Sequence, residues 1–278
     1  MLRIVIAAAA VVFAFCAPGI ASAQIVGTIT LGYEDNEYDF DDGYYYGEDR
    51  ESGPFLGAAV AAPLMRDNTN WIVVGEGRIQ SEKEEYSYGE EDHESVAHGA
   101  VHVGYRTDKW TVAGFYGMEN DHGSDVQEVG AEGQLYLTHM TVEGTAAYGD
   151  HEGSYCCDDY DGWNAQGNVV YYFNSLWSAG ANVGYASWDY YGGSTDLTTV
   201  GVNVEYWVPN TNYSIRGAYV HGEADDTYGE YSSDTFQAAF VVNLGADNAQ
   251  ERDHSGVGLS GADSFDLHTR LWESIYYD

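Results

Sequence analysis

The sequence predicts an all-β protein, an antiparallel transmembrane β-barrel of twelve strands, with ten strands as the main alternative. Three observations support this prediction. The chain begins with an export signal, its later segments alternate between apolar and polar residues, and the connections between those segments alternate between short and long. The composition agrees, because 34 glycines and 25 tyrosines with only four prolines favour β-structure with exposed aromatic rings over helices.

Residues 1–23 have the pattern of a secretory signal peptide. Arg3 supplies a positive charge, residues 4–15 are apolar, and Ala21, Ser22 and Ala23 form a small-residue cleavage site. The apolar stretch is too short to span a bilayer as a helix. We therefore expect cleavage before Gln24, a transmembrane β-barrel from residue 24 to residue 245, and a C-terminal tail from residue 246 to residue 278.

Twelve segments of about ten residues have the period-two pattern of strands. They lie near residues 25–34, 55–63, 71–80, 95–106, 109–118, 126–137, 140–149, 163–173, 176–187, 197–207, 212–222 and 235–245. A bilayer-spanning strand needs about 9–11 residues, so the lengths fit. The ten-strand alternative arises because the segment FLGAAVAAP (55–63) is apolar on both faces and can pair differently.

The two faces of these segments differ in a way that favours a membrane. In WNAQGNVVYYF (163–173), Trp163, Val169 and Phe173 share one face. The other face carries amides rather than the many Lys and Glu residues of a soluble sheet. Aromatic residues end the apolar faces of many segments, as in the interfacial girdles of membrane barrels.

The connections divide into two sets by length and charge. The five short ones predict turns on one side of the membrane, and the six longer ones predict loops on the other. The longer ones hold 31 of the 45 Asp and Glu residues, with only Arg50 and Lys83 as Arg or Lys residues. The first of them, residues 34–54, contains most of an acidic stretch, residues 33–51, that combines nine carboxylates with six aromatic residues.

In these features the chain resembles the Gram-negative outer-membrane β-barrel proteins, in particular the small porin-like ones. The resemblance implies long acidic extracellular loops, short periplasmic turns and a location in the outer membrane after export. One departure is that the last expected strand ends near Leu244, well before the chain end. We expect the remaining residues to form a partly ordered periplasmic tail; the alternative is that residues 265–276 fold back as a plug or an extra paired segment.

The polar face of the strands predicts the lining of the barrel. The candidate pore-lining residues are Glu76, Arg78, His98, His102, Glu128, Glu132, Glu143, Glu205 and Arg216. Their net acidic character favours a narrow channel for passive diffusion of small solutes with a mild cation preference. The alternative is a filled, non-conducting structural or surface-interaction barrel, because twelve strands lie between filled small barrels and wide porins.

Other functions have less support. A formal net charge of −35 with ten scattered Lys and Arg residues excludes a nucleic-acid binder. No arrangement of Ser and His residues indicates catalysis, so we expect no enzyme, and no residue spacing indicates a specific metal site or a cofactor. The acidic loops favour loose association with Ca²⁺ or Mg²⁺, through which they would contact lipopolysaccharide or other partners.

Cys156 and Cys157 are the only cysteines after the signal peptide. In an oxidising compartment they are candidates for a disulfide. A bond between them would be strained, because Cα atoms joined by a trans peptide are about 3.8 Å apart. Pairing between two molecules is the alternative.

Overall fold

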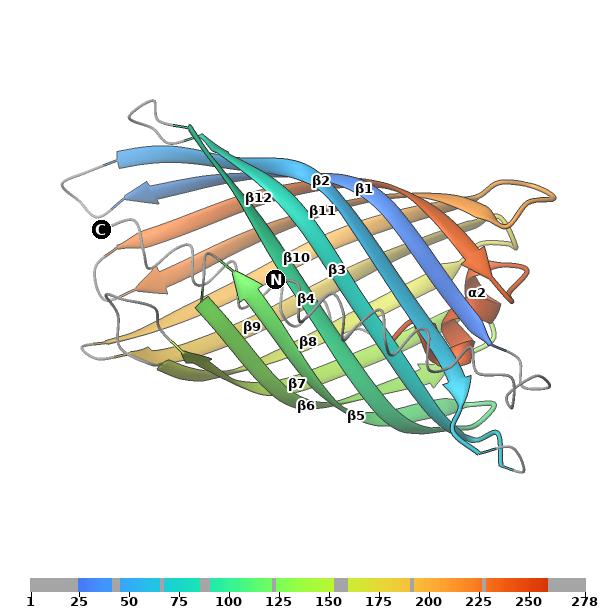
Figure 1. Cartoon of the computed structure of the whole chain (residues 1–278). Coiled ribbons are helices and arrows are strands. Elements are labelled where there is room, and N and C mark those ends of the chain that lie inside the picture. Colours follow the sequence, from blue (N-terminus) through green and yellow to red (C-terminus); the bar gives the residue numbers. More distant parts are fainter. Residues whose placement is uncertain are drawn as a thin grey trace.

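The computed structural model describes residues 25–41, 46–65, 68–85, 91–121, 124–152, 160–190, 193–226 and 229–259. They form one closed barrel of antiparallel strands (Figure 1). Each strand pairs with its neighbours in sequence, and β1 pairs with β12 to complete the barrel. The twelve-stranded barrel is therefore confirmed, and the ten-strand alternative is wrong. The predicted signal peptide lies outside the described residues.

The strands alternate in direction around the barrel. They are β1 (Val26–Asp41), β2 (Tyr46–Pro63), β3 (Trp71–Glu85), β4 (Glu91–Arg106), β5 (Trp110–Asp121), β6 (Ser124–Tyr136), β7 (Met140–Glu152), β8 (Tyr160–Tyr172), β9 (Trp177–Tyr190), β10 (Gly193–Trp207), β11 (Tyr213–Asp226) and β12 (Glu230–Leu244). We call the end with connections 64–70, 107–109, 137–139, 173–176 and 208–212 the turn end. The opposite end is the loop end.

The strands continue further toward the loop end than the sequence predicts. Most of the expected first loop, residues 34–54, is strand, because β1 and β2 stay paired as far as Asp41 and Tyr46. Polar side chains hold this extension together: Arg50 forms an ion pair with Asp35 at 2.5 Å, and the Tyr38 hydroxyl donates to Glu51 at 3.2 Å. The periodicity misses these ends because a ladder outside the bilayer needs no apolar face.

The outward face of the barrel has the layout of a membrane-facing surface. Exposed aliphatic side chains such as Leu31, Val112 and Val202 lie between two rings of aromatic side chains. At the turn end Trp177 contacts Tyr206, with ring centroids 4.6 Å apart, and at the loop end Trp163 contacts Tyr185 at 5.2 Å.

The spacing of the two aromatic rings fits a bilayer. Trp163 and Phe173 mark the two rings at the ends of β8 and are ten positions apart. At about 3.3 Å per residue and a strand tilt of about 40°, their separation along the barrel axis is about 25 Å. This height is typical of the apolar band of a membrane barrel.

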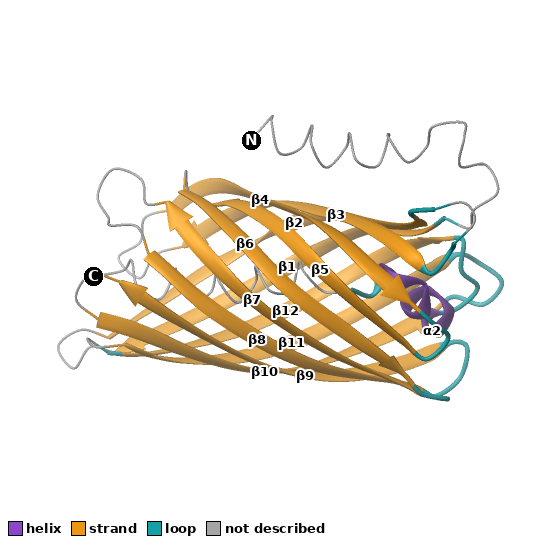
Figure 2. Cartoon of the chain, turned by 90° about the horizontal axis from the view of Figure 1, so that it is seen from below, coloured by secondary structure: helices purple, strands orange, loops and turns teal. Residues whose placement is uncertain are grey.

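After β12 the chain turns back toward the barrel interior. Gly245 has φ 76°, a conformation that disfavours any side chain, and it leads to a short helix, α2 (Ala249–Arg252), and a π-helical turn, η1 (Asp253–Val257). Figure 2 shows this helical segment at the turn end of the barrel. Among the described residues no helix has the length and apolar character needed to cross a membrane.

Candidate functional site

The candidate site is the lumen of the barrel. The structure places all nine predicted lining residues on the inward face. Glu76, Arg78, His98, Glu143, Glu205 and Arg216 line a cavity of about 330 Å³. His102, Glu128 and Glu132 are buried in the same face of the wall, at 5% exposure or less.

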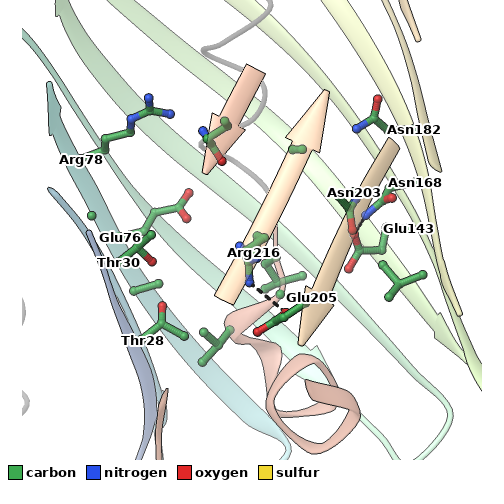
Figure 3. A pocket seen from close by; sticks show the side chains of 18 of the residues that line it. Thr28, Thr30, Glu76, Arg78, Glu143, Asn168, Asn182, Asn203, Glu205 and Arg216 are labelled. Atoms are coloured by element: carbon green, nitrogen blue, oxygen red, sulfur yellow. Dashed lines mark hydrogen bonds and ion pairs between the residues drawn. The ribbon is translucent and has the colours of Figure 1, made fainter. Parts of the chain in front are cut away.

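The cavity has two chemically different walls, shown in Figure 3. Glu76, Arg78, Thr28 and Thr30 extend from β1 and β3 on one side. Asn168, Asn182, Asn203 and Glu143 lie opposite, on β7 to β10. The ion pair between Arg216 and Glu205 lies between these two groups, near the helical segment.

One charged network joins three of the predicted residues. His102 on β4 contacts Glu132 through Nδ1 at 2.5 Å and Glu76 through Nε2 at 3.0 Å, and its ring packs against Phe115. This histidine is completely buried. The two carboxylates therefore supply polar partners for both ring nitrogens, which water does not reach. His98, also on β4, lies near Glu119, with Nδ1 3.6 Å from its carboxylate.

The other predicted residues have partners of their own. Arg78 forms an ion pair with Glu34 at 2.9 Å and lies over the ring of Phe55, 4.0 Å from its centroid. Glu143 accepts hydrogen bonds from the amides of Gln134 at 2.6 Å and Asn168 at 2.8 Å. Asn164 donates to Glu128 at 3.0 Å. Charges in a barrel wall persist when they are paired in this way or face water.

Glu34 is a site residue that the sequence reasoning missed. Its carboxylate also accepts hydrogen bonds from Gln80 at 3.2 Å and Gln237 at 2.8 Å, so it ties β1 to β3 and β12. One feature of the sequence indicates its inward position: Glu34 has the same period-two spacing as Thr28 and Thr30, both of which line the cavity. The acidic residues that follow Glu34 instead predict that it begins the first loop.

The second missed feature is the segment after β12. The sequence predicts a partly ordered periplasmic extension here, but residues 249–259 are seated in the turn end of the lumen. We call these residues the plug. The alternative fold-back of residues 265–276 lies outside the described part of the chain. The polar sequence ADNAQERDHSG has no apolar periodicity, so it carried no signal for this placement.

Arg252 anchors the plug through charge. Its guanidinium forms two contacts with Glu205, Nη1 to Oε1 at 2.6 Å and Nη2 to Oε2 at 2.9 Å. It also contacts Asp253 at 2.8 Å and donates to Asn243 at 3.2 Å. The Arg252 side chain is only 5% exposed, so this is a buried, two-pronged ion pair.

The rest of the plug packs against several strands around the wall, among them β3, β4, β6 and β8. Tyr172 donates to Asp253 at 2.8 Å, His254 stacks on Tyr136 with centroids 4.2 Å apart, and Arg106 donates to the carbonyl of Ser255. Beyond these contacts, Val257 and Leu259 join an apolar cluster with Ile72 and Val74 of β3.

Gly256 lets the plug approach this apolar cluster. It has φ 97°, and a Cβ atom there would lie 2.6 Å from Cδ1 of Ile72. Any other residue would therefore be strained by its backbone and crowded by the wall.

The loop end of the lumen is different in character. Five buried inward side chains form an apolar cluster: Val126, Ala186, Trp188, Leu197 and Ala224. The polar cavity therefore lies between this cluster and the plug along the barrel.

The remaining candidate residues give no further site. Cys156 and Cys157 lie outside the described residues. Within the described ranges, no group of three His, Cys, Asp or Glu side chains is arranged to hold a metal ion.

The comparisons with known proteins identify the class of fold. No protein-family model matches the chain, and no curated protein matches it by sequence. Among solved structures, it is similar to an outer-membrane channel of Pseudomonas putida F1, with a TM-score of 0.61 and 10% identity over 80% of this chain and 95% of that one.

A second similar structure is the β domain of the Bordetella autotransporter BrkA, with a TM-score of 0.53 and 11% identity over 79% of this chain and 100% of that domain. At these identities the comparisons show the fold alone. The chain thus has the fold of the outer-membrane β-barrels, to which this channel and this autotransporter β domain belong.

Proposed function

We propose that this protein is an outer-membrane channel for the passive diffusion of small solutes, with a mild preference for cations and no enzymatic activity. The observation that carries this proposal is a polar, acid-rich cavity inside a barrel with a membrane-facing surface. The described acidic side chains at the cavity are Glu34, Glu76, Glu143, Glu205 and Asp253, and the arginines are Arg78, Arg216 and Arg252. An acidic lining raises the local concentration of cations.

The similarity to an outer-membrane channel supports the same proposal, as does the expected signal peptide, whose removal would accompany export to the outer membrane. The plug is consistent with a channel that is narrow, because it occupies part of one end of the lumen without filling the cavity.

Conductance in planar bilayers tests the proposal. We expect small stepwise currents and a reversal potential that indicates cation preference. Glu143→Gln preserves the side-chain volume but removes one negative charge from the cavity, so it should reduce cation selectivity. Glu251→Gln, at an exposed position of α2, is the matched control and should leave selectivity unchanged. Absence of stepwise currents under conditions that open a control porin would refute the channel function.

The alternative is a non-conducting barrel whose acidic loop end contacts partners or lipopolysaccharide through Ca²⁺ or Mg²⁺. Two observations favour it: the plug occupies the turn end, and the paired extensions of β1 and β2 present exposed carboxylates such as Glu37 and Glu48 beyond the aromatic ring. Shortening this extension by deleting residues 37–48 should then leave folding intact and change the response of the cells to divalent cations.

A further inference from the structure

Three asparagines from adjacent strands form a continuous amide surface in the cavity. Asn168 on β8 is the cross-strand partner of Asn182 on β9, and Asn203 on β10 pairs with Gly180, two residues before Asn182. All three line the cavity and lie together in Figure 3. We call Asn168, Asn182 and Asn203 the amide wall.

The amide wall has unused hydrogen-bonding capacity. An asparagine side chain offers two donors and one oxygen that accepts two bonds. Within the described part of the chain, Asn168 donates to Glu143, but its Oδ1 atom is buried without a partner. The amides of Asn182 and Asn203 make no hydrogen bond to described residues. Buried polar atoms normally find a partner, so Oδ1 of Asn168 calls for a polar occupant of the cavity, either water or a solute, and the half-buried amides of Asn182 and Asn203 can bind the same occupant.

Two of the carboxylates around the amide wall are held in ion pairs. Glu205 is held by Arg252 and Arg216, and Glu34 is held by Arg78. A third carboxylate, Glu143, accepts hydrogen bonds from the amides of Gln134 and Asn168. A charged solute that binds at Glu205 or Glu34 would have to separate an ion pair, at a cost that is large for buried ions. A neutral solute leaves them intact, and the opposite side of the cavity offers it the hydroxyl groups of Thr28 and Thr30.

The chemistry of the wall selects among neutral solutes. Amides both donate and accept, and so do hydroxyl groups, whereas ammonium groups only donate and carboxylates only accept. The cavity of about 330 Å³ is at the small end of the range for ligand sites, which is about 300–1,000 Å³. Gly57 on β2 adds room, because a Cβ atom there would meet nothing closer than 3.7 Å.

From these observations we propose that the amide wall binds a neutral polyhydroxylated solute of monosaccharide size inside the lumen. This assignment rests on the proposed channel function, since it names the class of solute that the channel admits. Hydroxyl groups of the solute would take the place of water on Asn168, Asn182 and Asn203.

Calorimetry with the detergent-solubilised full chain tests the assignment, with D-glucose as the probe. Triethylene glycol is the matched solute, because its ether oxygens accept but only its two ends donate. We expect wild-type protein to bind glucose and not triethylene glycol. The nearly isosteric double variant Asn182→Leu/Asn203→Leu should bind glucose at least about tenfold more weakly, a change of about 1.4 kcal/mol.

Thr198→Val, at an outward position on β10, is the control and should bind glucose as the wild type does. Equal binding of the two solutes, no binding of glucose, or unchanged binding by a folded double variant would each overturn the assignment. Bilayer recordings separate it from the channel proposal. Ion currents without glucose binding would refute only the amide-wall site, and glucose binding without ion currents would refute only the channel.

Discussion

Replacing Arg252 with methionine removes the charged anchor of the plug while preserving much of its length. In the wild type the guanidinium contacts both oxygens of Glu205 and lies only 5% exposed. Removing one partner from a buried ion pair costs about 3–5 kcal/mol. Glu205 keeps Arg216 at 3.3 Å and Ser214 at 2.5 Å, so we expect the lower figure of about 3 kcal/mol. Since about 1.4 kcal/mol is a factor of ten, the seated plug should lose stability by roughly 150-fold.

Thiol accessibility measures this change directly. Val257→Cys places a reporter in the buried apolar cluster, in a chain whose Cys156 and Cys157 are replaced by serine. With Arg252→Met, we expect maleimide labelling of the reporter to accelerate by about two orders of magnitude, and single-channel conductance to rise.

Arg216→Met is the matched control. Arg216 contacts the same Glu205 but belongs to the barrel wall, and its side chain is 35% exposed. It should therefore change labelling only slightly. The reasoning fails if Arg252→Met labels at the wild-type rate, or if Arg216→Met has an equal effect.

Four further changes probe the lumen. Gly57→Leu should lower conductance, because the leucine side chain fills part of the cavity. It should not disturb the backbone, so the thermal unfolding temperature should stay close to that of the wild type. Gly256→Ala should strain the φ of 97° by about 1–3 kcal/mol and accelerate labelling of the plug reporter by about tenfold or more; unchanged labelling would contradict the role of this glycine. Burial lowers the pKa of His254 below its usual 6.5, and this effect outweighs that of the negative charge of Asp253, which raises the pKa. The seated plug therefore favours the neutral histidine, and it loses stability as the pH falls below 6.5. Conductance should therefore rise on acidification in the wild type and less in a His254→Gln variant. Ending the chain after Leu259 should raise conductance if the alternative fold-back of residues 265–276 occurs in the lumen, and equal conductance would count against that fold-back.

The membrane-spanning parts of the strands were predictable from sequence because the bilayer imposes a simple rule on them. Between the aromatic rings, one face must be apolar, so residues such as Val200, Val202 and Val204 alternate regularly with polar ones. Beyond the loop-end ring this rule ends. Asp35 and Arg50 form an outward ion pair there, and no apolar periodicity marks the strand to which each belongs.

The lumen was predictable only in part. Alternation assigns a side chain to one face or the other, and the structure places all nine candidates on the inward face. Partners depend on register and strand tilt, which alternation does not specify. His102 reaches Glu76 on β3 and Glu132 on β6, two strands away from β4, and nothing in the local sequence of any of them indicates the triad. The plug was harder still, because Arg252 is seated by contacts distant in sequence rather than by any periodic pattern.

The plug lies against the seam of the barrel, where the first strand, β1, pairs with the last strand, β12. Val257 and Leu259 share an apolar cluster with Val26 of β1, and Arg252 donates to Asn243 of β12. These are the two strands whose pairing completes the barrel, and Gly245 turns the chain inward directly after that pairing ends at Leu244. The plug therefore contacts both strands of the pair that closes the barrel, β1 and β12. Its contacts stabilise that pairing, and the closed barrel in turn provides the surface against which the plug is seated.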